Sequence, residues 1–134
     1  GKLGTLSVSV YLLLGAVGLP VFAGFQGGLG ALLGATGGYL AGFLLTALTV
    51  WGAERRLGKS APVFLVSCLL GLALCYLFGS VWFAAVYAAA SGPVGLVTVL
   101  GWCVFPFVLP DLAKLALAVV LSRRLAAALA RRTA

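Results

Sequence analysis

Residues 60–110 read SAPVFLVSCLLGLALCYLFGSVWFAAVYAAASGPVGLVTVLGWCVFPFVLP, a run of 51 residues without a charged side chain. A second uncharged run of 51 residues spans positions 3–53. Each run is long enough for two membrane-crossing helices of about 20 residues and a connecting loop. Backbone groups in hydrocarbon must pair within their own segment, and neither run shows the sustained alternation of a transmembrane strand. The sequence therefore predicts an all-α, polytopic membrane helical bundle with about four transmembrane helices, in a single domain over residues 1–134.

The composition agrees with an exterior that faces lipid. Of the 134 residues, 63% are hydrophobic and 8% are charged, whereas soluble domains carry about 25% charged residues. The chain has no His, which excludes imidazole acid–base catalysis and His-ligated metal within it. Cys68, Cys75 and Cys103 lack CxxC spacing and are expected to be small apolar packing residues. We expect no enzyme activity, no cofactor and no metal site.

Helix breakers and charges divide the chain into the expected spans. These lie at about Leu3–Leu19, Tyr39–Trp51, Ala61–Gly79, and from Pro110 to Leu121. The first is stopped by Pro20, which cannot donate a backbone hydrogen bond. The second leads into a charged turn. Between Ser80 and Pro110, aromatic residues alternate with glycine and proline, so we expect short helices at the membrane surface there.

The distribution of basic residues predicts which ends face the cytoplasm. With four crossings, eight of the nine basic residues fall on one side: Lys2, Arg55, Arg56, Lys59, Arg123, Arg124, Arg131 and Arg132. Lys and Arg accumulate in short cytoplasmic loops. We therefore expect Arg55, Arg56, Lys59 and the C-terminus in the cytoplasm, and the segment before Tyr39 outside. The basic residues that set the membrane topology account for the net charge of +7, so nucleic-acid binding is not needed to explain this charge.

Asp111 and Lys114 are ionisable residues in an apolar environment. Each costs about 2.5–3.5 kcal/mol at the centre of a membrane helix, so such residues are candidates for function. At i, i+3 they share a helical face. Pro110 suits a first helical position, which would place Asp111 at the positive end of the helix dipole. Two interpretations stay open: a structural ion pair near the outer interface, or a polar clamp for a small ligand.

Residues 21–38 include seven glycines, a density that favours a shaped loop. Phe22, Phe25, Gln26 and Tyr39 frame this loop with aromatic faces and polar tips. The glycines at positions 30, 34, 38 and 42 also repeat every four residues, which is typical of tight helix packing. The residues alone leave a ligand loop and helix packing equally open.

Two motifs resemble those of a known family. The first is GLPVFAGFQGGLGALLGATGGYLAGF (Gly18–Phe43), which resembles the signature of the BioY family, the biotin-specific substrate-binding S components of energy-coupling-factor (ECF) transporters. The second is FPFVLPDLAKLALAVVLSRRL (Phe105–Leu125), which resembles the family's closing helix with its DxxK motif. The stretch YLFGSVWF (Tyr76–Phe83) is a weaker match. Two positions depart from the family pattern: Ala35 replaces a usual Pro, and Leu109–Pro110 replaces a usual Pro-Gly.

The resemblance implies a six-helix S component in a prokaryotic cell membrane. This chain would match its C-terminal two thirds and lack the first two helices. Biotin would be captured from outside and taken up with the help of a transmembrane coupling subunit and separate ATPase subunits. Biotin would then be a transported substrate and not a cofactor, and the lipid bilayer would surround the protein.

The resemblance also implies a set of ligand-binding residues: Asp111, Lys114, Gln26, Phe25, Gly27, Gly28 and Tyr39. The orientation of biotin stays open, because Lys114 suits either the ureido carbonyl or the valerate carboxylate. Two alternatives in function stay open as well. One is an S component for another small vitamin, and the other is a structural membrane protein whose glycines pack helices.

Overall fold

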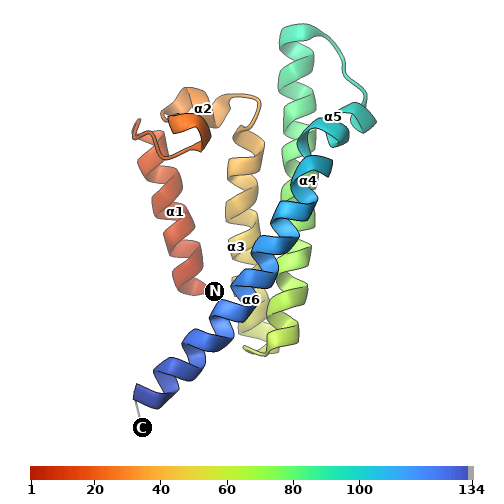
Figure 1. Cartoon of the computed structure of the whole chain (residues 1–134). Coiled ribbons are helices and arrows are strands. Elements are labelled where there is room, and N and C mark those ends of the chain that lie inside the picture. Colours follow the sequence, from red (N-terminus) through yellow and green to blue (C-terminus); the bar gives the residue numbers. More distant parts are fainter. Residues whose placement is uncertain (133–134) are drawn as a thin grey trace.

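The computed structural model describes residues 1–132, which form six α-helices and one 3-10 turn (Figure 1). The elements are α1 (Lys2–Ala16), η1 (Ala23–Phe25), α2 (Leu29–Leu33), α3 (Gly37–Leu57), α4 (Ala61–Ser91), α5 (Leu96–Cys103) and α6 (Phe105–Arg132). The predicted all-α fold class is confirmed. By length and composition, α4 and α6 can cross a membrane, and α1 is a shorter apolar helix. The number of crossings stays a prediction.

Helices α3 and α4 form the most closely packed pair, a hairpin around a short turn (Figure 1). A Cβ atom on Gly42 would lie 2.6 Å from the Sγ atom of Cys75. The Thr46 hydroxyl donates to the carbonyl of Gly71 across the pair at 2.9 Å. Small residues and interhelical hydrogen bonds hold helices together where lipid removes the hydrophobic driving force. Cys75 is a buried packing residue, as predicted, and the three cysteines of the described chain are free.

The turn between α3 and α4 is set by glycine and proline. Gly58 has φ +87° and its N–H donates to the carbonyl of Glu54, a helix ending that glycine allows because it has no Cβ. Pro62 lies in the first turn of α4, where its missing N–H is not needed. Arg55 and Arg56 belong to the last turn of α3, where cations favour the helix dipole. The predicted charged turn is therefore mostly helix.

The predicted end of the third span at Gly79 is wrong, because α4 continues to Ser91. Gly79 is a packing position and not a breaker: a Cβ atom there would lie 2.2 Å from the ring of Tyr39. Gly92, with φ +94°, ends the helix instead. Short helical structure does follow, as expected for this region, but it is confined to α5.

The predicted start of the last helix at Pro110 is also wrong. Helix α6 begins at Phe105, and Pro106 occupies its first turn, where proline costs nothing. Pro110 lies inside the helix, so it cannot donate to the carbonyl of Pro106. Asp111 therefore lies in the second turn and not at the positive end of the helix dipole. Along positions 105–131, no residue of α6 is buried.

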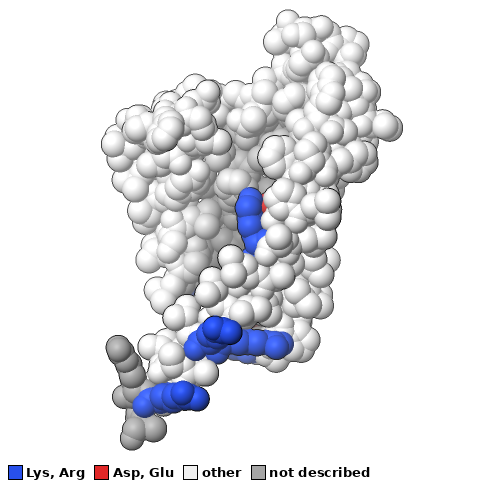
Figure 2. Space-filling view, viewed as in Figure 1, with Lys and Arg blue, Asp and Glu red and all other residues white. Residues whose placement is uncertain are grey.

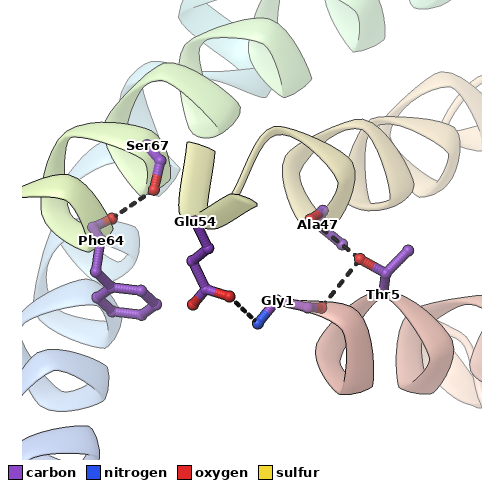
Figure 3. A network of polar contacts seen from close by, with 6 residues as sticks. All are labelled: Gly1, Thr5, Ala47, Glu54, Phe64 and Ser67. Carbon is purple, nitrogen blue, oxygen red and sulfur yellow. Dashed lines mark hydrogen bonds and ion pairs between the residues drawn. The ribbon is translucent and has the colours of Figure 1, made fainter. Parts of the chain in front are cut away.

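Helix α1 is joined to α3 by polar contacts near its start. The Thr5 hydroxyl donates to the carbonyl of Ala47 at 3.1 Å (Figure 3). The Glu54 side chain points toward Gly1 in the same view. Helix α1 ends at Ala16, slightly before the predicted Leu19. These contacts place α1 beside α3, with the Gly-rich segment at the far end.

Candidate ligand-binding site

The Gly-rich segment forms an ordered loop between α1 and α3. The N–H of Phe22 donates to the carbonyl of Gln26 at 3.0 Å, which closes a tight turn over η1. The Phe22 ring is buried against Gly15 of α1 and meets the Tyr11 ring edge-on, with centroids 5.5 Å apart. The segment is thus the shaped loop that the glycine density favours, with the short helix α2 inside it.

Two glycines secure this loop to the end of α1. A Cβ atom on Gly27 would lie 2.3 Å from the carbonyl oxygen of Leu19. Gly28 has φ +90°, and its N–H donates to the carbonyl of Gly15 at 2.6 Å. Close approach and positive φ are the two properties that only glycine supplies without strain. Both glycines therefore shape the backbone of the loop.

The glycine repeat divides into two groups. Gly38 and Gly42 face α4, where Cβ atoms would meet Trp82 and Cys75 at 2.3 and 2.6 Å. No described atom beyond the local backbone lies within 4 Å of the Gly30 Cβ position. The helix-packing interpretation therefore holds for Gly38 and Gly42 of α3, and a ligand-binding role of the loop before α3 stays a prediction.

Phe25 projects from the tip of the loop. Its side chain is 88% exposed, and its φ of +56° is rare for a bulky residue. Such strained residues cluster at binding sites, where the surrounding structure holds them in place. Gln26 next to it is also exposed. The two predicted loop residues are therefore accessible to a ligand.

Asp111 accepts two hydrogen bonds from different helices. Its Oδ1 atom accepts from the Lys114 ammonium at 3.0 Å, and its Oδ2 atom accepts from the Tyr76 hydroxyl at 2.5 Å. The Asp111 side chain is 22% exposed and that of Lys114 is 75% exposed. Each carboxylate oxygen has about two acceptor sites, and an ammonium has three donors. The pair can therefore accept another N–H and donate to another oxygen.

Tyr39 occupies the interface between α3 and α4. Its hydroxyl lies 3.1 Å from the Ser80 hydroxyl, and its ring covers Gly79. Ser80 follows Tyr76 by four residues, so the partners of Tyr39 and Asp111 lie on one side of α4. The Trp82 indole N–H donates to the carbonyl of Gly34 at 2.9 Å, which ties α4 to the Gly-rich segment.

The predicted site residues flank a hollow but do not all meet. Within residues 1–132, α6 packs against α4 and α5 and not against α1, α2 or α3. Figure 2 shows a hollow between the α1–α2 side and the α4–α6 side, with a blue and red group on its wall. The other blue groups gather at one end of the molecule. Asp111 and Lys114 belong to α6 and thus to a different wall from the loop residues, which lie between α1 and α3.

A shallow depression of about 340 Å³ lies elsewhere, and its lining includes Trp51, Arg55 and Lys59. The candidate site is an open hollow and not a closed pocket.

Tyr76 and Ser80 are absent from the sequence-based site. Tyr76 stands 35 residues before Asp111, and local spacing carries no information about such a contact. One signal was available: a carboxylate in a membrane helix needs hydrogen-bond donors, and polar side chains are scarce in α4. Tyr76 is the donor that Asp111 uses.

The helices and the charged pair define an α-helical membrane protein of several apolar helices. The sequence profile of the BioY family matches residues 1–131, and the chain belongs to this family.

Relatives agree with this assignment. The chain is 40% identical over 124 residues to a protein of Pyrococcus horikoshii described as a probable biotin transporter BioY, and the match covers 92% of this chain and 68% of the relative. It is 41% identical over 128 residues to the biotin transporter BioY of Thermotoga maritima, with coverages of 92% and 69%.

A solved structure has the same fold. It is the S-component for biotin from an ECF-type ABC transporter, with a TM-score of 0.76 and 31% sequence identity. The match covers 90% of this chain and 64% of the solved chain. The chain therefore spans about two thirds of the length of these proteins.

Proposed function

We propose that this chain is the larger part of a biotin-binding S component of an ECF-type transporter. The observation that carries the proposal is the Asp111–Lys114 pair of α6, bonded to Tyr76 of α4, in a chain that belongs to the BioY family. Its role is to bind and pass on a substrate, so it is a transport component and not an enzyme. ATP hydrolysis is the task of separate subunits.

The chemistry of biotin suits the groups on the two walls. The ureido ring of biotin offers N–H donors for the free acceptor sites of Asp111 and a carbonyl acceptor for the free donors of Lys114. The exposed ring of Phe25 offers an apolar face for the bicyclic ring, and Gln26 adds a polar tip. In a second orientation, Lys114 binds the valerate carboxylate.

Single substitutions in the natural full-length protein test the site. Asp111→Asn keeps an acceptor but loses the charge, so biotin binding falls by about 1.5–3 kcal/mol, the scale of a hydrogen bond to a charged group. Lys114→Ala costs at least as much, because it also leaves Asp111 without its counter-charge. Isothermal titration with biotin measures both losses.

The double substitution Asp111→Asn with Lys114→Gln separates a clamp from a structural pair. If the pair is purely structural, removing both charges leaves biotin affinity nearly normal. If the pair is a ligand clamp, biotin affinity stays low although the protein folds. Near-normal affinity would falsify the site assignment. Thermal stabilisation of the wild type by another vitamin, and not by biotin, would assign a different substrate.

We also propose the arrangement of the chain in a prokaryotic cell membrane and its partners. The Gly-rich loop lies outside, the end with Arg55, Arg56 and Lys59 is cytoplasmic, and the transmembrane coupling subunit and ATPase subunits of the transporter assemble with it. The support is the gathering of basic residues at one end (Figure 2).

Single-cysteine labelling tests this arrangement. In a background with Cys68, Cys75 and Cys103 replaced, an impermeant reagent should modify a cysteine at position 26 from outside. A cysteine at position 58 should react only from inside. Labelling of both positions from the same side contradicts the proposed topology.

A further inference from the structure

We propose that Tyr76 is a positioning residue of the candidate biotin site. Its phenolic hydroxyl holds the Asp111 carboxylate and thereby fixes which acceptor sites of Asp111 remain for a ligand. The inference rests on the proposed function, because a biotin site must exist for Tyr76 to act on it.

The carboxylate of Asp111 is held from two directions. Lys114 holds the Oδ1 atom from within α6, and Tyr76 holds the Oδ2 atom from α4 at 2.5 Å. The Lys114 side chain is 75% exposed on a flexible stem, so it cannot define the orientation of the carboxylate. Tyr76 carries its hydroxyl on a rigid ring, and a short O–H···O⁻ bond is among the strongest in proteins. Tyr76 therefore sets the orientation.

Tyr76 stands in the most closely packed helix pair of residues 1–132. It follows Cys75, which is 3% exposed and packs against Gly42 of α3. It lies one turn before Ser80, which is 1% exposed and bonded to Tyr39. Helix α6, in contrast, has no buried residue between 105 and 131. The hydroxyl thus links the closely packed α3–α4 hairpin to the Asp111 side chain, which stands on a helix without buried residues between 105 and 131.

Positioning of this kind favours binding by lowering its entropic cost. A carboxylate that is already oriented loses less freedom when a ligand arrives. With Oδ2 engaged by Tyr76 and Oδ1 by Lys114, Asp111 retains about one acceptor site on each oxygen. Either site can accept one N–H of a cyclic urea, while the neighbouring carbonyl of that urea faces the Lys114 ammonium. Loss of the phenolic hydroxyl should therefore weaken biotin binding without removing a ligand contact.

The first test is Tyr76→Phe in the natural full-length protein, with biotin affinity measured by isothermal titration. We expect affinity to fall about 10-fold, the scale of one hydrogen bond to a charged group. Tyr87→Phe is the matched control, because Tyr87 lies on the same helix and its ring contacts are with Phe83 and Trp102. It should change affinity less than about 2-fold.

A double-mutant cycle shows whether Tyr76 acts through Asp111. In the Asp111→Asn background, Tyr76→Phe should have less than about 2-fold further effect, because the charged acceptor is already gone. If the fold-losses in biotin affinity of the two substitutions multiply, Tyr76 acts independently of Asp111, and the proposal is overturned.

A readout without ligand keeps this inference separate from the proposed function. The infrared carboxylate band that disappears in Asp111→Asn belongs to Asp111. Tyr76→Phe should shift this band and Tyr87→Phe should not; an unshifted band overturns the positioning role. Absence of biotin binding by the wild type overturns the proposed function instead, and the band still decides whether Tyr76 orients Asp111.

Discussion

The α3–α4 hairpin and helix α6 differ in how they are held. In the hairpin, glycines on both helices bring the backbones together, and Thr46 bonds across the interface to Gly71. Helix α6 is nearly as long as α4 but packs only against α4 and α5 among the described helices. The hairpin therefore carries the stability of the fold, and α6 carries the charged groups of the candidate site.

Gly42→Val should break the hairpin and have the largest effect. Its Cβ would lie 3.0 Å from the Cα atom of Cys75, so the helices must separate. Overpacking of this kind costs about 3 kcal/mol. The matched control is Gly52→Val on the same helix, since no described atom beyond its own helical turn lies within 4 Å of the Gly52 Cβ position. Thermal unfolding in detergent measures both, and equal losses would contradict the tight interface.

Gly27→Val should affect the loop more than the hairpin. The new side chain collides with the carbonyl of Leu19, so the loop must move away from α1. We expect biotin binding to weaken by about 2 kcal/mol, the scale of a hydrogen bond left unmade. The melting temperature should fall less than it does in Gly42→Val. Gly30→Ala is the control, because its Cβ position is open. A loss of fold with intact binding in the folded fraction would favour the packing interpretation for this glycine.

Thr46→Val sharpens the description of the hairpin by removing one hydrogen bond and keeping the shape. We expect a loss of about 1 kcal/mol in unfolding free energy, the usual net value of an intramolecular hydrogen bond. Thr49→Val is the control, because the Thr49 hydroxyl bonds to the carbonyl of Leu45 on its own helix, as Thr46 does to Gly42, and among the described residues it has no bond across the interface. Chemical unfolding curves measure the difference. Equal losses at the two positions would mean that the bond to Gly71 adds nothing.

Leu117→Ala in α6 should have the smallest effect. Leu117 is 58% exposed, whereas Leu40 in α3 is 8% exposed. We expect the free energy of unfolding to fall by less than about 0.5 kcal/mol for Leu117→Ala and by about 2 kcal/mol for Leu40→Ala. An equal loss of unfolding free energy at Leu117 and Leu40 would show that α6 is packed as firmly as α3.

The sequence predicts where helices lie better than where they end. Uncharged length locates the helices, because a lipid-facing segment needs a continuous apolar run. The ends of α4 and the start of α6 depend on packing and on which proline occupies the first turn. Gly79 looks like a breaker in the sequence but faces Tyr39 in the fold, and Pro106 takes the place expected for Pro110.

The candidate site shows the same division between local and distant information. The Asp111–Lys114 pair follows from spacing within one helix, and the structure forms it at 3.0 Å. The shaping roles of Gly27 and Gly28 follow from glycine density. The contact with Tyr76 joins positions 35 apart and depends on how α6 crosses α4. No local sequence pattern predicts how α6 crosses α4.

The length of α4 has a consequence for the lipid around the protein. With 31 residues, α4 is about 46 Å long, whereas the 21 residues of α3 span about 31 Å, close to the thickness of a hydrocarbon core. In the proposed membrane arrangement, the close packing of the hairpin keeps α4 from tilting by itself to shorten its span. We therefore expect its last turns, which carry Tyr87, to lie at the level where aromatic rings meet lipid headgroups. We expect hydrophobic mismatch with shorter or longer acyl chains to act first on this end of α4.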